Sequence, residues 1–202
     1  MLIDPAEEQR VLLPPAAIRL WPRALRAESA TLFAALQREV EFTQHRVRIF
    51  GRELPAPRLS AWHGDTGCHY RYSGVTYAPQ PLGPVLQALR ACVEAACGHR
   101  FNSVLLNLYR DGADAMGWHS DDEPELGPVP VIASISLGAP RRFLLRSRTL
   151  PRQRQSLELP DGSLLLMEAP LQAHWQHALP RTRRPCGPRL NLTWRLIEAG
   201  RG

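Results

Sequence analysis

Two segments in the first half of the chain carry apolar residues at helical spacing. From Ser29 onward, apolar positions recur three and four residues apart as far as Val40, which predicts a helix there. A second segment begins at Pro84, a residue that fits the first turn of a helix, and stops at Gly98, a common helix terminator. Four prolines in the first two dozen residues oppose regular structure, so we expect an irregular N-terminal arm over about residues 1–24.

After about residue 100 the pattern changes to that of short strands. Ala133, Ile135 and Leu137 alternate with Ser134 and Ser136, which is typical of a strand with one apolar face. Similar short runs occur in “FNSVLLNLY”, “RRFLLRS”, “GSLLLMEAP” and “RLNLTWRLI”. Two helices followed by many short strands with Gly and Pro turns predict an α+β protein, mainly β with outer helices, whose core is a barrel or jelly roll.

Length and composition favour one globular domain. The 202 residues are enough for a sizeable core, so we expect residues 1–202 to form a single domain. The N-terminus lacks the layout of a secretory signal and no stretch is long enough to span a membrane, which predicts a cytoplasmic protein, or a nuclear one in a eukaryote. The four cysteines show no metal-binding spacing, so we expect reduced thiols. The net charge of +6 favours a polyanionic partner, although a coding bias explains why all 25 basic residues are arginine.

The stretch “GWHSDDE” concentrates side chains that bind metals. His119 and Asp121 are two residues apart, so in a strand both point to the same side. A second histidine would complete the set of two histidines and one carboxylate that holds ferrous iron and leaves coordination positions open. His174 and His177 in “HWQH” are the candidates, and because residues three apart on a strand face opposite ways, we expect at most one to be a ligand. The alternative is an acidic turn without a metal.

The stretch “RLNLTWR” indicates a site for an anion. In a strand, its polar residues would share one face and its leucines and tryptophan the other. Two arginines on the inner face of a barrel would be buried charges without partners, which is costly unless an anion lies there. A dicarboxylate would satisfy them, and Asn107 and Tyr109 could donate further hydrogen bonds to it. The polar face consists of Arg189, Asn191, Thr193 and Arg195.

In their order and separation, these motifs resemble those of the AlkB family of iron(II)- and 2-oxoglutarate-dependent dioxygenases. The resemblance covers roughly residues 45–197 and rests on “NLYRDG”, “HSDDE”, “ASISLGAPRRF”, “HWQHALP” and “RLNLTWR”. It implies a double-stranded β-helix, a relative of the jelly roll, with the catalytic core at about 100–197 and a nucleotide-recognition lid at about 43–80. It also implies Fe(II), 2-oxoglutarate as a cosubstrate, and O2.

The resemblance also implies roles for individual residues. The iron ligands would be His119, Asp121 and His177, the last because the distal histidine of the family precedes a segment like “HALP”. Arg195 would bind the remote carboxylate of 2-oxoglutarate as a bidentate pair, and Arg189 would lie nearer its iron-bound end. The other cosubstrate contacts would be Asn107, Tyr109 and Asn191.

The segments “RIFGRELPAPRLSAW” and “HYRYSG” most resemble the family members that repair double-stranded DNA. These members carry an apolar hairpin finger, matched here at residues 49–51, and Phe50 would enter the gap left by a flipped base. Tyr72 and His119 would sandwich the base, and Glu123 would read its exocyclic amino group. The other substrate contacts would be Arg58, Tyr70 and Ser73. The alternatives are a core position for Phe50 and cross-strand packing for the tyrosines.

The activity implied by the resemblance is oxidative demethylation of N-alkylated bases in DNA, such as 1-methyladenine and 3-methylcytosine. Hydroxylation of the methyl group would release formaldehyde and succinate. DNA would be the partner, double-stranded with single strands as a further substrate, and the protein would act as a monomer away from membranes. Two alternatives stay open: a 2-oxoglutarate dioxygenase acting on RNA, protein or a small molecule, and a nucleic-acid binding module with an inactive metal site. Gln176 and Trp194 depart from the residues usual in the family, which leaves the preferred lesion open.

Overall fold

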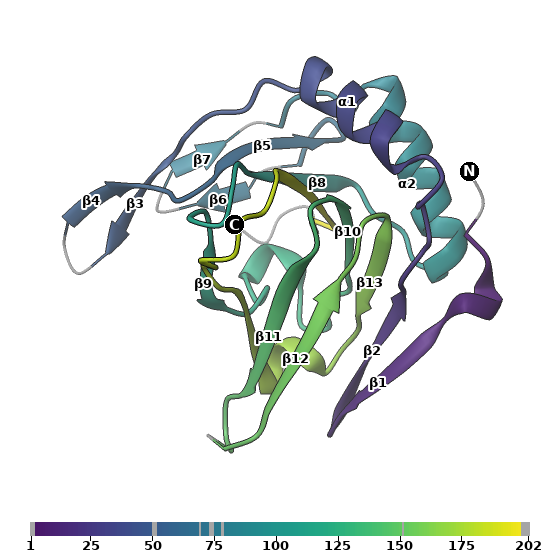
Figure 1. Ribbon diagram of the computed structural model, residues 1–202, viewed down its shortest axis with the longest axis vertical. Helices are drawn as coiled ribbons and strands as arrows, with labels where there is room; N and C mark the ends of the chain where they lie inside the picture. The colour runs from purple at the N-terminus through teal and green to yellow at the C-terminus, as the bar shows by residue number, and fades with distance from the viewer. Residues whose placement is uncertain are drawn as a thin grey trace.

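Two antiparallel β-sheets face each other in the computed structural model, which describes residues 3–49, 52–68, 70–72, 75–77, 79–150 and 152–198 (Figure 1). The larger sheet has the strand order β1 (Gln9–Leu13), β2 (Ala16–Trp21), β13 (Ser163–Met167), β10 (Ile132–Gly138), β15 (Arg189–Arg195), β8 (Ser103–Tyr109) and β5 (Leu59–Gly64). The smaller sheet has the order β12 (Arg154–Leu159), β11 (Arg141–Ser147), β14 (Trp175–Leu179) and β9 (Met116–His119). Two hairpins are separate from both sheets: β3 (Arg46–Ile49) with β4 (Arg52–Pro55), and β6 (Tyr70–Tyr72) with β7 (Val75–Tyr77).

Helices α1 (Ser29–Glu39) and α2 (Pro84–Cys97) cover the outer face of the larger sheet (Figure 1). Their apolar sides, including Leu36 and Leu89, share one hydrophobic cluster with residues of the sheet. Both helices lie where the helical spacing predicts them, and Gly98 ends α2 with a φ of 75°, a conformation that glycine adopts without strain. The remaining helical segments are Pro5–Glu7, Pro124–Leu126 and α3 (Leu171–His174). Among the described residues, no helix has both the length and the hydropathy needed to cross a membrane.

Strand β15 shows how alternation separates the core from the cavity. Leu190, Leu192 and Trp194 are fully buried in the cluster beneath the helices. The polar residues of β15 line a cavity between the two sheets, as predicted from their alternation. A second apolar cluster, which includes Trp175 and Phe143, packs between the sheets beside this cavity. The mainly β class with outer helices is therefore confirmed, and the cavity lies inside the β core.

The prediction of an irregular arm over residues 1–24 is wrong. β1 and β2 form a hairpin, and β2 pairs with β13, so this segment extends the larger sheet. Pro14 and Pro15 lie at the turn of the hairpin, where their missing N–H groups interrupt no ladder hydrogen bond. Leu13 and Ile18, which follow the strand alternation, are buried between the sheets. The prolines therefore mark a turn between two strands.

The hairpins β3–β4 and β6–β7 fall within residues 43–80, the segment predicted to be a nucleotide-recognition lid. β3 and β4 project beyond the two sheets in Figure 1. Within the predicted lid, residues 50, 51, 69, 73, 74 and 78 lie outside the described residues, and they include Phe50, Gly51 and Ser73. The nucleotide-binding role of this segment stays a prediction.

Candidate active site

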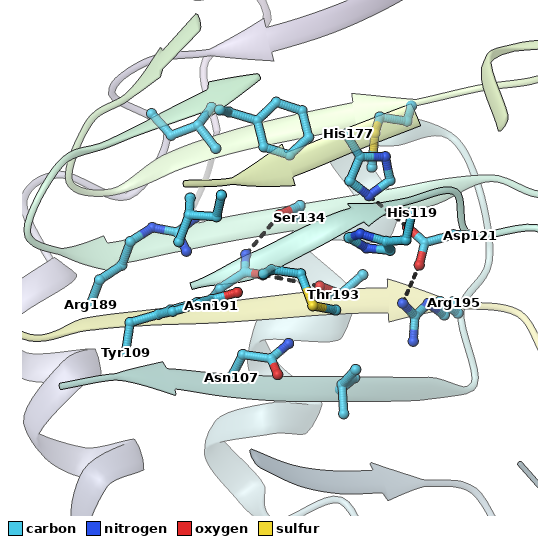
Figure 2. Close-up of a pocket in the computed structure, with 16 residues that line it drawn as sticks. Asn107, Tyr109, His119, Asp121, Ser134, His177, Arg189, Asn191, Thr193 and Arg195 are labelled. Carbon is cyan, nitrogen blue, oxygen red and sulfur yellow. Dashed lines mark hydrogen bonds and ion pairs between the residues drawn. The ribbon is translucent and has the colours of Figure 1, made fainter. Parts of the chain in front are cut away.

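Three side chains that can bind a metal meet in the cavity between the sheets (Figure 2). β9 ends at His119, Asp121 follows two residues later, and β14 supplies His177, which pairs with His119 across the strands. Their ligand atoms lie within 4.8 Å of one another, and the centroids of the two histidine rings are 4.2 Å apart. No other group of three or more such side chains occurs among the described residues. Two histidines and one carboxylate are a donor set that suits ferrous iron.

The hydrogen bonding and burial of His119 leave its Nε2 free to bind a metal. Its Nδ1 lies 2.9 Å from the carbonyl oxygen of Gly117, an acceptor, so Nδ1 carries the proton and donates it. Burial, with a further contribution from His177, lowers the pKa of His119 to about 4. At neutral pH the ring is therefore uncharged, and the lone pair of Nε2 is available.

Asp121 is held in place from two sides. Arg195 donates a hydrogen bond to Oδ1 of Asp121, and the backbone N–H of Asp121 donates to Oε1 of Gln172 at 3.0 Å. Burial by itself would raise the pKa of Asp121, but the Arg195 guanidinium and His177 together hold this pKa well below its usual range. Asp121 is therefore a carboxylate at neutral pH. Sequence reasoning missed Gln172, because a single glutamine carries no spacing signal.

Another part of the cavity contains a buried positive charge, Arg189, which Figure 2 shows well apart from the three ligands. Its Nη2 donates to Ser136 Oγ at 2.8 Å, and its Cζ lies 5.3 Å from the ring centroid of Tyr109. Its Nε has no hydrogen-bond partner within the described part of the chain. Burial lowers the pKa of Arg189 to about 10, and a second cation, Arg141, acts in the same direction. A buried cation next to another cation favours binding of an anion, such as a carboxylate.

Neutral polar side chains occupy the cavity wall between Arg189 and the candidate ligands. Arg58 Nε donates to Asn107 Oδ1 at 2.8 Å, which leaves the amide nitrogen of Asn107 for other partners. Asn191 Nδ2 donates to Ser134 Oγ at 2.8 Å and to a backbone carbonyl of β10 at 2.9 Å, while its Oδ1 accepts from Thr193. The amide of Asn191 is thus tied to its own sheet. Apolar side chains complete the lining: Leu105, Met116, Phe143, Leu159, Met167 and Leu179.

The expected positions of the two arginines are reversed. Arg195, expected at the remote carboxylate, pairs with the candidate ligand Asp121, while Arg189, expected nearer the iron, lies away from it. Arg189 and Arg195 are six positions apart, which corresponds to about 20 Å of strand. Alternation therefore fixes their shared face but does not show which end of β15 meets β9.

The stretch “HWQH” is not a single strand, contrary to expectation. His174 ends α3, and the chain becomes extended at Trp175, so His177 lies on β14. Of the two candidate histidines, only His177 belongs to the three-residue group.

The predicted substrate residues are only partly placed by the structure. Arg58, expected near the DNA, is buried and contacts Asn107. Glu123 is half-buried just after the candidate ligands and does not line the cavity. Tyr70 and Tyr72 lie on β6, where only the backbone is described. Their contacts to a base, like those of Phe50 and Ser73, stay predictions.

Known proteins share both the sequence pattern and the fold. A family model described as the 2OG-Fe(II) oxygenase superfamily matches residues 18–195. Human “DNA oxidative demethylase ALKBH2” is 42% identical over 182 residues, which cover 85% of this chain and 70% of that protein. Bovine “Alpha-ketoglutarate-dependent dioxygenase alkB homolog 3” is 39% identical over 204 residues, which cover 96% of this chain and 68% of that protein.

A solved structure, that of OsALKBH1, matches 93% of this chain and 100% of its own with a TM-score of 0.65 at 14% identity. Together with the family model, this likeness confirms the predicted jelly-roll fold.

Proposed function

The chain belongs to the AlkB family of iron(II)- and 2-oxoglutarate-dependent dioxygenases, and on that premise we propose that it removes N-methyl groups from DNA bases. Relatives named DNA oxidative demethylases match 85% of the chain at 42% identity. The proposed substrates are 1-methyladenine and 3-methylcytosine. Methylation on a ring nitrogen gives these bases a positive charge, which a nearby carboxylate and an aromatic face would favour.

One feature of the cavity carries the proposal. The cavity holds three candidate metal ligands in one place and, in another, a buried arginine that has no acidic partner among the described residues. A dicarboxylate cosubstrate needs both, because one end must meet the metal while the other carboxylate is neutralised. A binding module without catalysis would have no use for this costly combination.

In the proposed reaction, the protein binds and orients the iron and the cosubstrate and excludes water from them. His119, Asp121 and His177 would hold iron(II), with Arg195 and Gln172 fixing the carboxylate of Asp121. Arg189 would hold the remote carboxylate of 2-oxoglutarate, and the amide nitrogen of Asn107 and the hydroxyl of Tyr109 would donate to its other oxygens. The apolar lining lowers the local dielectric and strengthens each of these contacts.

The bound iron and 2-oxoglutarate supply the oxidising chemistry, in which 2-oxoglutarate and O2 become succinate and CO2 and one oxygen atom is added to the methyl carbon. The hydroxymethyl group on the base nitrogen then leaves as formaldehyde and restores the base. This second step needs no nucleophile from the protein.

The predicted lid would present the base to the cavity. We propose that Phe50 fills the gap left by the flipped nucleotide in duplex DNA, and that Tyr72 and the ring of His119 sandwich the base. Glu123, two residues beyond Asp121, would accept a hydrogen bond from the exocyclic amino group. Arg58 is buried and would contribute by orienting the side chain of Asn107 through its hydrogen bond to Oδ1.

Succinate formation tests the substrate class. Purified protein with iron(II), 2-oxoglutarate and oxygen is given a methylated DNA oligonucleotide, the same sequence as methylated RNA, or no nucleic acid. We expect methylated DNA to stimulate succinate formation most. Stronger stimulation by RNA would move the substrate assignment to RNA, and the absence of succinate in every reaction would favour the binding module.

A further inference from the structure

Arg146, on the outer face of the smaller sheet, connects the two strands that carry the histidines. It lies on β11, and its guanidinium donates to Oε1 of Gln176 on β14, from Nε at 2.9 Å and from Nη2 at 2.7 Å. The same guanidinium lies over the ring of Trp118 on β9, 4.4 Å from the ring centroid. Because β14 lies between β11 and β9, Arg146 reaches across one strand to contact the next.

Both partners of Arg146 are direct neighbours of candidate metal ligands. Trp118 precedes His119 on β9, and Gln176 precedes His177 on β14. Successive side chains of a strand point to opposite faces, so the two partners lie outside the sheet while the two histidines point into the cavity. Any rotation or slip of either strand on the outside therefore moves a histidine on the inside.

The backbone ladder holds these two strands together only weakly. β9 has four residues and forms the edge of the smaller sheet. Its pairing with β14 is irregular, because His177 lies opposite His119 while Leu179 lies opposite Met116, one residue out of step. Such an irregularity interrupts the ladder hydrogen bonds. Side-chain contacts must therefore supply part of what fixes the spacing of the two histidines.

We propose that Arg146, Gln176 and Trp118 form a clamp that positions His119 and His177 for metal binding. Two hydrogen bonds from a charged donor and the contact with an aromatic face fix the guanidinium in one orientation. Arg146 is a positioning residue, since none of the three clamp residues lines the cavity. This inference deepens the proposed function and rests on His119 and His177 as iron ligands.

A Co(II) titration of the metal-free protein tests the clamp, with calorimetry for the affinity and visible absorption for the coordination geometry. Arg146→Ala is expected to bind Co(II) about tenfold more weakly than wild type, at the lower end of the effect of removing groups that orient metal ligands. Its absorption bands should also change, because the two histidines no longer hold one geometry. The matched control is Arg154→Ala, on β12 opposite Arg146 and one strand farther from β9, which should bind like wild type.

Two further variants separate positioning from a general structural role. Arg146→Lys keeps a cation that can donate hydrogen bonds and should recover part of the affinity, although lysine lacks the planar fork. The double variant Arg146→Ala with Gln176→Ala should bind no more weakly than Arg146→Ala alone, because the pair acts as a unit. If Arg146→Ala does not fold, Arg146→Lys decides: weaker Co(II) binding at wild-type thermal stability supports the clamp, and unchanged binding overturns it.

Wild-type affinity and an unchanged spectrum in Arg146→Ala would overturn the inference. A fall in affinity that only parallels a loss of thermal stability in the metal-free form would overturn it as well. Wild-type protein and His119→Ala separate this failure from that of the proposed function. If wild type itself binds no Co(II), or His119→Ala binds it equally well, the ligand assignment fails; if only Arg146→Ala is indistinguishable from wild type, the clamp alone fails.

Discussion

Arg189 and Arg195 have the same side chain and lie on the same strand face, yet their surroundings give them different tasks. Arg189 has no acidic partner in the described part of the chain, so we expect it to bind the remote carboxylate of 2-oxoglutarate. Arg189→Gln should raise the KM for 2-oxoglutarate about 10- to 100-fold, since charge-assisted hydrogen bonds contribute about 1.5–3 kcal/mol. The measurement is the rate of succinate formation against 2-oxoglutarate concentration.

Arg195→Gln is the matched control for this prediction. Arg195 pairs with Asp121, so its loss should weaken Co(II) binding, which Arg189→Gln should leave at the wild-type level. The reverse result, in which Arg189→Gln loses the metal and Arg195→Gln changes only the KM for 2-oxoglutarate, would restore the order of the two arginines expected from the sequence.

The loop between β8 and β9 leads into the strand that ends at the candidate ligand His119. Asp114 in this loop accepts three hydrogen bonds from Arg110, from the backbone N at 2.9 Å and from Nε and Nη2 at 2.8 Å. The side-chain hydrogen bonds from Arg110 lower the pKa of Asp114 below its usual value. The folded protein therefore favours the carboxylate, and this contribution to stability is present above the unfolded pKa, about 3.9, and is lost as the pH falls through the folded pKa.

Asp114→Asn should accordingly lower the free energy of unfolding at pH 7 by about 1–3 kcal/mol, the effect of weakening a buried hydrogen-bonded charge. The difference from wild type should stay constant between pH 7 and pH 5 and shrink below about pH 4. Urea unfolding of the metal-free proteins across this range measures it. If the difference in free energy of unfolding between wild type and Asp114→Asn became larger in acid, the ion pair between Arg110 and Asp114 would not be the stabilising interaction.

The N-terminal hairpin is an integral part of the larger sheet, and two adjacent leucines test this. Leu13 on β1 is 2% exposed, whereas Leu12 beside it is 72% exposed. Leu13→Ala should lower the free energy of unfolding by about 2–5 kcal/mol through loss of packing, while Leu12→Ala should change it by less than about 0.5 kcal/mol. Chemical denaturation of both variants is the measurement, and equal small effects would indicate that the hairpin is not packed in solution.

Elements with a regular period could be predicted from the sequence, and elements that depend on distant partners could not. The helices at Ser29–Glu39 and Pro84–Cys97 follow from apolar spacing, and the polar face of β15 follows from alternation. The N-terminal hairpin was missed because prolines at a turn and prolines in an irregular arm look alike locally. Gln172 and Arg146 were missed because their tasks depend on contacts with Asp121, Gln176 and Trp118, which the fold brings together.

At the scale of the whole molecule, the hairpin β3–β4 projects beyond the two sheets, and we propose that it recognises DNA while the cavity between the sheets carries out the chemistry. The proposal that Phe50 enters duplex DNA predicts that Phe50→Ala loses most demethylation of double-stranded oligonucleotides, because the gap beside the flipped base is no longer filled. Activity on single strands, where no gap forms, should be retained. Parallel assays on matched single- and double-stranded substrates measure this, and full duplex activity in Phe50→Ala would end the intercalation model.

In the proposed function, the methyl group of a damaged base is oxidised in the cavity between the two sheets. The most direct test reconstitutes the protein anaerobically with iron(II) and 2-oxoglutarate, adds oxygen, and measures by mass spectrometry an oligonucleotide that contains 3-methylcytosine or 1-methyladenine. We expect a loss of mass equal to one CH2 group, as the methyl group is replaced by hydrogen, that requires both iron(II) and 2-oxoglutarate and is abolished in His119→Ala. Succinate formation with the methylated oligonucleotide left intact would contradict the assignment of DNA bases as the substrate.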